Sequence, residues 1–203
     1  MPVSRPGGYV FDRRLGRYRG ANGRLIGRAE VRRAIDVAIR NADQQARSLA
    51  DQYRRGELSL GAWEREMRTL VKNTHTLNAA AAKGGFDQLT PADYGRVGRI
   101  VRDEYNHLSG FAGEVAAGFQ RTDGTMNSRA MLYTRGGRRT YELTQRSVAR
   151  DTGHSEEKSI LAPADHCAQC VEQAALSWQP IGRLVPPGAR TCLSNCKCEL
   201  TYR

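Results

Sequence analysis

The five cysteines of this 203-residue chain all lie between Cys167 and Cys198, and their placement constrains the fold more than any other feature. Cys167 and Cys170 form a Cys-x-x-Cys pair, and Cys192, Cys196 and Cys198 follow after 21 intervening residues. An odd number of cysteines fits a set of disulfides poorly and fits metal ligation well. We therefore expect these residues to bind a metal ion.

The spacing is typical of a structural zinc site, in which four thiolates surround Zn²⁺ at about 2.3 Å. Cys167 and Cys170 are the first two predicted ligands. Among the last three cysteines the spacing favours Cys192 and Cys196, with Cys198 as the spare, and the pair Cys196 and Cys198 is the close alternative because both lie on one face of a strand. His166, next to the first pair, could substitute for a cysteine as a metal ligand, although a His beside a Cys-x-x-Cys pair more often lies outside the ligand set. Four thiolates leave no open position, so the predicted zinc is structural.

Apolar residues that recur every three or four positions predict helices over most of the chain before the cysteines. Two such stripes, over 29–55 and 59–83, predict an antiparallel helical hairpin. A third helix is expected to begin with a capping box at Thr90 and Asp93, with Pro91 in its first turn, and to bury residues as far as Phe119. A fourth is expected over 128–151, weakened at Gly136 and Gly137.

The helical periodicity ends near Gly153, and the remaining residues are too few to bury a core of their own without a cross-link. Short strands are predicted at 159–163 and 198–203, with a solvated loop at 155–158. The chain is therefore predicted to be mainly α, in three parts. These are an Arg/Gly-rich extended arm (1–28), a helical hairpin or bundle domain (29–152), and a small zinc-binding α+β module (153–203).

The net charge of +11 is unevenly distributed. Residues 151–203 contain five Lys/Arg and six Asp/Glu, whereas residues 1–28 contain seven Arg and only one acidic residue. Such an excess favours a polyanionic partner through counterion release. The arm has five candidate contact residues for nucleic-acid phosphates or for acidic groups on a capsid protein, and both partners stay open: Arg13, Arg14, Arg17, Arg19 and Arg24.

No run of about 18 apolar residues is present, and the first residues lack the apolar segment of a secretory signal. We therefore expect no membrane partner and a reducing cytoplasmic environment.

The C-terminal segment resembles the phage Mu F-like head morphogenesis family, the minor head proteins of tailed bacteriophages. Cys167 and Cys170 match the first cysteine pair of that family, the stretch 176–188 matches its Pro-rich middle, and "SNCKC" (194–198) matches its closing motif. The family has a His before the closing pair, and Cys192 stands near that position here. The resemblance is specific over 165–203 and looser over the helices.

The resemblance implies a multi-copy minor capsid protein of the virion head or neck, present in the host cytoplasm during assembly. It also implies contact with the portal or the major capsid protein and exposure to packaged DNA. Two alternatives are a zinc-containing nucleic-acid enzyme of the HNH nuclease type and a zinc-ribbon DNA-binding protein. Neither His75, His107 nor His154 has an acidic partner at a convincing spacing, so no enzymatic activity and no catalytic residue are expected. A zinc-ribbon DNA-binding protein would need positive charge on its zinc module, and the net charge of residues 151–203 is slightly negative.

Overall fold

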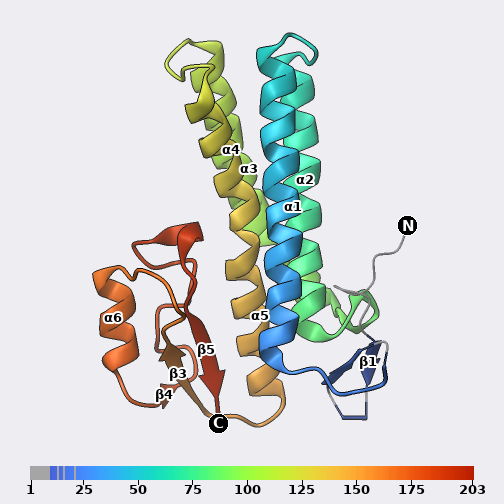
Figure 1. The fold of residues 1–203 in the computed structure, drawn as a ribbon, viewed down its shortest axis with the longest axis vertical. Helices are drawn as coiled ribbons and strands as arrows, with labels where there is room; N and C mark the ends of the chain where they lie inside the picture. Colours follow the sequence, from blue (N-terminus) through green and yellow to red (C-terminus); the bar gives the residue numbers. More distant parts are fainter. Residues whose placement is uncertain (1–9, 13, 16, 21) are drawn as a thin grey trace.

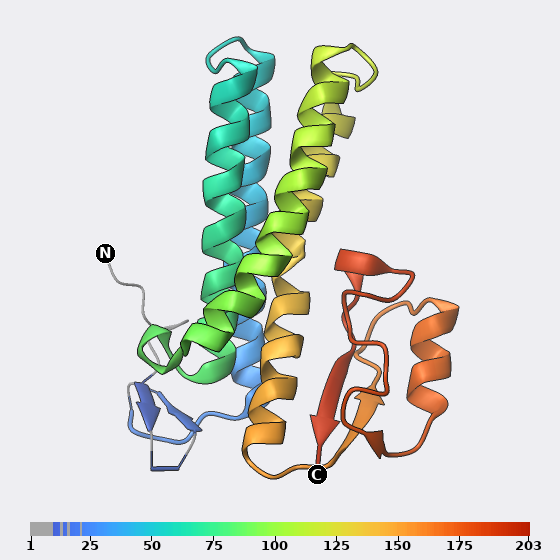
Figure 2. The same cartoon turned by 180° about the vertical axis from the view of Figure 1, so that it is seen from behind.

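A computed structural model describes residues 10–12, 14–15, 17–20 and 22–203, and it confirms the mainly helical prediction. Helix α1 (Arg28–Arg54) runs the length of the molecule, α2 (Leu60–Lys83) returns beside it, and α3 (Pro91–Ala116) runs up again. Helices α4 (Gly124–Arg135) and α5 (Gly137–Asp151) together form the fourth rod (Figures 1 and 2). The result is an up-down bundle with a small module beside its lower half.

The helix ends follow local signals in the sequence. Ser59 caps α2 by accepting a hydrogen bond from the Ala62 N–H at 3.2 Å, and Gly84 ends the same helix with a φ of 103°. Thr90 and Asp93 form the expected capping box of α3. A short 3₁₀ turn, η2 (Phe86–Gln88), connects α2 with α3.

The expected fourth helix is divided in two at Gly136 and Gly137. At Gly137 the helix approaches α2 so closely that a Cβ atom would lie 2.7 Å from Nδ2 of Asn78. Glycine is therefore needed at this position for the packing of α5 against α2.

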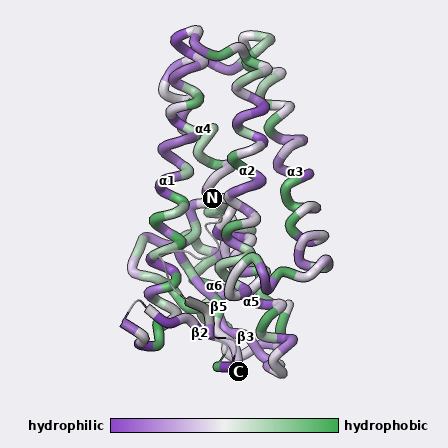
Figure 3. Tube along the Cα trace, turned by 90° about the vertical axis from the view of Figure 1, so that its right-hand side faces the viewer, coloured by the Kyte–Doolittle hydropathy of each residue, from purple (hydrophilic) through white to green (hydrophobic). Residues whose placement is uncertain are grey.

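Two large apolar clusters and a small one, around Val97 and Val101 of α3, fill the bundle, and polar and apolar residues are interspersed along the helices (Figure 3). The larger surrounds Trp63, whose ring packs edge-on against Phe111 at 5.3 Å between centroids. The second lies at the lower end, around Ile35 and Tyr141. The prediction that Phe119 belongs to the core is wrong: α3 ends at Ala116, and Phe119 is 84% exposed.

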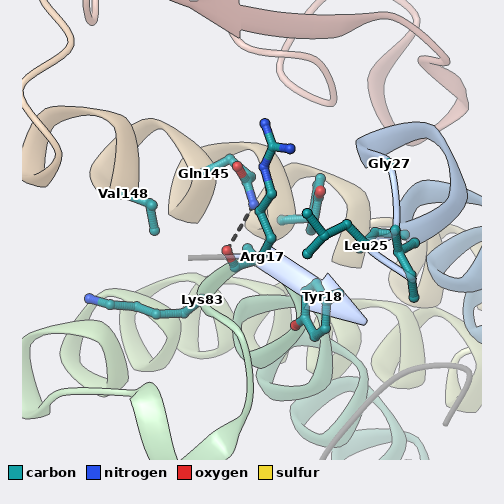
Figure 4. Close-up of a pocket in the computed structure, with 11 residues that line it drawn as sticks. Arg17, Tyr18, Leu25, Gly27, Lys83, Gln145 and Val148 are labelled. Carbon is teal, nitrogen blue, oxygen red and sulfur yellow. Dashed lines mark hydrogen bonds between the residues drawn. The ribbon is translucent and has the colours of Figure 1, made fainter. Parts of the chain in front are cut away.

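The described part of the predicted arm is ordered where it contacts the helices. Strands β1 (Val10–Asp12) and β2 (Arg17–Arg19) pair in antiparallel fashion. The Tyr18 hydroxyl donates to the Ala81 carbonyl at 2.7 Å, and Ile26 is buried in the lower cluster. Arg17 and Tyr18 border a cleft of about 430 Å³ between this segment and the ends of α1, α2 and α5 (Figure 4).

The C-terminal module contains a three-stranded antiparallel sheet in which β3 (Glu156–Ile160) lies between β4 (Gln179–Pro180) and β5 (Glu199–Tyr202). Helix α6 (Ala168–Ala175) and a 3₁₀ turn, η3 (Leu193–Asn195), carry the cysteines beside it. Two strands were thus predicted in the right regions, but the loop prediction for 155–158 is wrong, because Glu156–Lys158 belong to β3.

None of the helices in the described residues has the length and apolar character needed to cross a lipid bilayer.

Candidate metal centre

The five cysteine sulfurs come together in one cluster. The Sγ atom of Cys170 lies 3.6 Å from Sγ of Cys192 and 3.7 Å from Sγ of Cys196. Two sets of three sulfurs, each set close enough to hold an ion, share Cys170: one adds Cys167 and Cys192, the other Cys196 and Cys198. None of the cysteines forms a disulfide. The arrangement can therefore hold a metal ion.

The first cysteine pair is positioned by the start of α6. Cys167 is the N-cap residue of that helix, and its carbonyl accepts hydrogen bonds from the N–H groups of Cys170 and Val171 at 2.9 and 3.2 Å. The Cys-x-x-Cys spacing thus becomes a single helical turn, which brings both sulfurs to one end of α6.

The second group of cysteines lies on a tight loop. The Leu193 N–H donates to the Arg190 carbonyl at 2.7 Å, and Leu193 has a φ of 45°, which a branched side chain rarely adopts. The turn η3 then returns the chain so that Cys192 and Cys196 face Cys170. Gly188, with a φ of 86°, lies so close to α5 that a Cβ would be 2.6 Å from Cβ of Arg139.

The choice of the spare cysteine stays a prediction. Cys198 was favoured for that role by spacing, but its side chain is fully buried and its sulfur belongs to the second set of three. Its Sγ also lies 3.6 Å from Nδ1 of His166. Cys192, in contrast, is only half-buried. All five cysteines therefore remain candidates for four ligand positions.

The thiols differ in acidity. A hydrogen bond with Thr191 lowers the pKa of Cys167 to about 6, whereas burial raises the pKa of Cys198 to about 12. Burial also raises the pKa of Cys170 and Cys192. Because a coordinating cation deprotonates thiols outright, a bound ion would remove these differences.

A buried arginine beside the sulfurs was not predicted from the sequence. The Arg190 side chain is fully buried and donates to the Val185 carbonyl and to Oγ of Ser159 at 2.9 Å each; burial raises the pKa of Cys170, and the Arg190 guanidinium partly offsets this rise. Its Nη1 atom has no hydrogen-bond partner among the described residues. A buried guanidinium is costly unless a negative charge lies close to it, and the thiolates of a metal-bound cluster would provide that charge.

A buried ion pair connects the module to the bundle. Glu157 of β3 accepts two hydrogen bonds from Arg146 of α5, at 2.8 and 3.0 Å. The N–H groups of Gly182 and Leu184 donate to the same carboxylate at 3.0 and 2.9 Å. Four donors therefore satisfy a fully buried carboxylate at the boundary between the helices and the sheet.

Arg32 forms another connection between the two parts. Its guanidinium pairs with Glu142 of α5 at 3.0 Å and with Glu199 of β5, and it donates to the Cys198 carbonyl at 3.1 Å. The cysteine loop is thus held against α1 and α5 by charged groups that come from far apart in the sequence.

Four of the five candidate arginines of the arm lie among the described residues. Arg13 lies outside the described residues. Arg19 is paired with Asp12 at 2.8 Å, which uses its charge within the hairpin. Arg14, Arg17 and Arg24 are exposed.

His75, His107 and His154 lie on α2, on α3 and in the connection between α5 and β3. His75 is fully buried and contacts Oγ1 of Thr140 at 2.6 Å through Nδ1. His107 is exposed on α3, and Nδ1 of His154 lies 3.0 Å from Oγ1 of Thr152. Among the described residues, the groups of three or more metal-capable side chains consist of cysteines alone.

Comparisons with protein-family models, with curated proteins and with solved structures find no match for this chain.

Proposed function

We propose that the protein is a structural minor head protein of a tailed bacteriophage, and that its C-terminal module is organised by one zinc ion. The convergence of all five cysteine sulfurs carries the proposal. The resemblance rests on Cys167, Cys170 and the "SNCKC" segment. In the folded chain these residues lie against one another across the module. The motif thus corresponds to a three-dimensional cluster.

Zinc is the metal that suits this donor set. Sulfur is a soft ligand, and a tetrahedral site with Zn–S bonds of about 2.3 Å has sulfur–sulfur edges of about 3.8 Å. The two Cys170 separations of 3.6 and 3.7 Å are close to this value. The ion would fix the loop that carries Cys192–Cys198 against α6.

In this proposal the protein acts by binding and not by turnover. The bundle contacts the portal or the major capsid protein, and the zinc module presents a rigid surface beside it. The Arg-rich N-terminal segment contacts the capsid lattice or the packaged DNA. The protein is then present in several copies in the virion head or neck, after assembly in the host cytoplasm.

The test is purification of head particles from host cells that produce them with a tagged copy of this chain. The proposal predicts that the chain sediments with the heads in a fixed number of copies and cross-links to portal or major capsid protein. Replacement of Cys170 by Ser is expected to remove the zinc and to reduce incorporation into heads. Absence of the wild-type chain from purified heads, or zinc-dependent DNA cleavage by it, would contradict the proposal.

A further inference from the structure

Helix α1 carries an arginine at every seventh position: Arg33, Arg40, Arg47 and Arg54, called here the arginine row. At a rise of 1.5 Å per residue, neighbouring members are about 10.5 Å apart along the helix axis. Their direction drifts by only about 20° per heptad, so they stay on one side of α1. All four side chains are exposed.

Three acidic residues of α1 near the row are each paired with an arginine. Asp36 pairs with Arg138, and Asp43 pairs with Arg135 at 2.8 Å. Asp51 pairs with Arg54 itself, at 2.9 Å.

Three arginines of the row keep an uncompensated charge. Arg33, Arg40 and Arg47 form no ion pair with any described residue. Arg47 contacts the sulfur of Met131 through Nη2, at 3.9 Å. Arg33, Arg40 and Arg47 thus form a line of positive charge that no described residue pairs with.

The line continues onto the C-terminal module. Arg135, at the end of α4, donates to Oδ1 of Asn195 at 3.1 Å, which brings the cysteine loop next to α1. Lys197 is exposed at this junction, and partial desolvation together with the nearby charges of Arg138, Arg135 and Arg40 lowers its pKa. A basic residue thus lies beside the row in a module whose net charge is otherwise slightly negative.

We propose that Arg33, Arg40 and Arg47, extended by Lys197, form a binding surface for the phosphate backbone of a nucleic acid. Evenly spaced charges over about 21 Å match a repeating polyanion. Guanidinium groups bind phosphate oxygens with two parallel hydrogen bonds. Contacts to phosphates carry no sequence information, so binding through this surface is independent of sequence. The inference rests on the proposed function in one respect, which is that packaged DNA is the nucleic acid the surface meets.

The test compares two triple variants of the full zinc-loaded chain in binding to a 30-base-pair duplex, measured by fluorescence anisotropy over a series of salt concentrations. The first is Arg33→Gln, Arg40→Gln and Arg47→Gln. The second is Arg65→Gln, Lys72→Gln and Arg102→Gln, which removes the same charge from exposed sites on α2 and α3 that form no ion pair with described residues. Zinc content and the far-ultraviolet circular dichroism of both variants are checked first.

Loss of three phosphate contacts is expected to reduce the slope of log K against log salt by about 2.7, since each contact contributes about 0.9. The control variant is expected to keep the wild-type slope. Equal losses in the two variants would overturn the proposal, as would wild-type binding to polyglutamate that matches binding to DNA. If the row variant binds DNA normally while the wild-type chain still sediments with heads, only this inference fails.

Discussion

Replacement of Glu157 by Gln tests how the module is held on the bundle. In the wild-type protein one carboxylate oxygen accepts from Arg146, Gly182 and Leu184, and the other accepts from Nε of Arg146 at 2.8 Å. A glutamine keeps one acceptor but places an NH₂ group against a donor, and it leaves the Arg146 guanidinium, whose side chain is 10% exposed, without a counter-charge. Breaking one partner of a buried pair costs about 3–5 kcal/mol.

The assay is urea unfolding of the zinc-loaded chain, followed by the fluorescence of Trp178 in a Trp63→Phe background. With an m-value of about 2 kcal/mol/M, the unfolding midpoint is expected to fall by about 2 M. Glu156→Gln is the matched control, because Glu156 forms an exposed pair with Arg203, and such pairs contribute about 0–1 kcal/mol. Equal midpoints for the two variants would refute the reasoning that the buried pair fastens the module.

Three further results are expected. Burial lowers the pKa of His75 to about 4, below the value of about 6.5 in the unfolded chain. The neutral His75 therefore contributes fully to the free energy of unfolding above pH 6.5. This contribution, about 3 kcal/mol, is lost as the pH falls toward 4. Urea unfolding at several pH values should show this slope in the wild type but not in His75→Gln; identical slopes would contradict it. Arg190→Met is expected to weaken zinc binding by about 10–100-fold in a chelator competition, and Arg183→Met, at an exposed site, to leave it unchanged. Removal of zinc by a chelator is expected to increase hydrogen exchange across residues 153–203 and to leave α1, α2 and α3 protected; uniform exchange along the chain would be inconsistent with a separate metal-organised module.

Local signals in the sequence were enough to predict much of the bundle. The caps at Ser59 and at Thr90 with Asp93 involve residues within one turn of each other, so their geometry is independent of the rest of the fold. The cysteine cluster was also predictable, because metal ligation requires specific residue types at short spacings. The arginine row is visible in the sequence as a repeat of seven residues. The sequence does not show, however, that the neighbouring acidic residues are paired with other groups, and this pairing is what leaves Arg33, Arg40 and Arg47 unpaired.

Other features depend on contacts between distant segments. Glu157 appears in a polar stretch that is typical of a loop, and it is buried because Arg146 and the backbone of residues 182–184 meet it there. Nothing in the local sequence distinguishes Arg190 from an exposed arginine, because its burial depends on residues 159 and 185 and on the cysteines around it. Phe119 fits the apolar stripe of α3, but the helix ends one turn too early to bury it.

The most direct test of the central claim is native mass spectrometry of the full chain, purified under reducing conditions without added metal, combined with titration of its thiols. The account predicts one zinc ion per chain and thiols that react slowly until a chelator is added. A metal-free chain whose five cysteines all react at once, or are joined as disulfides, would contradict it.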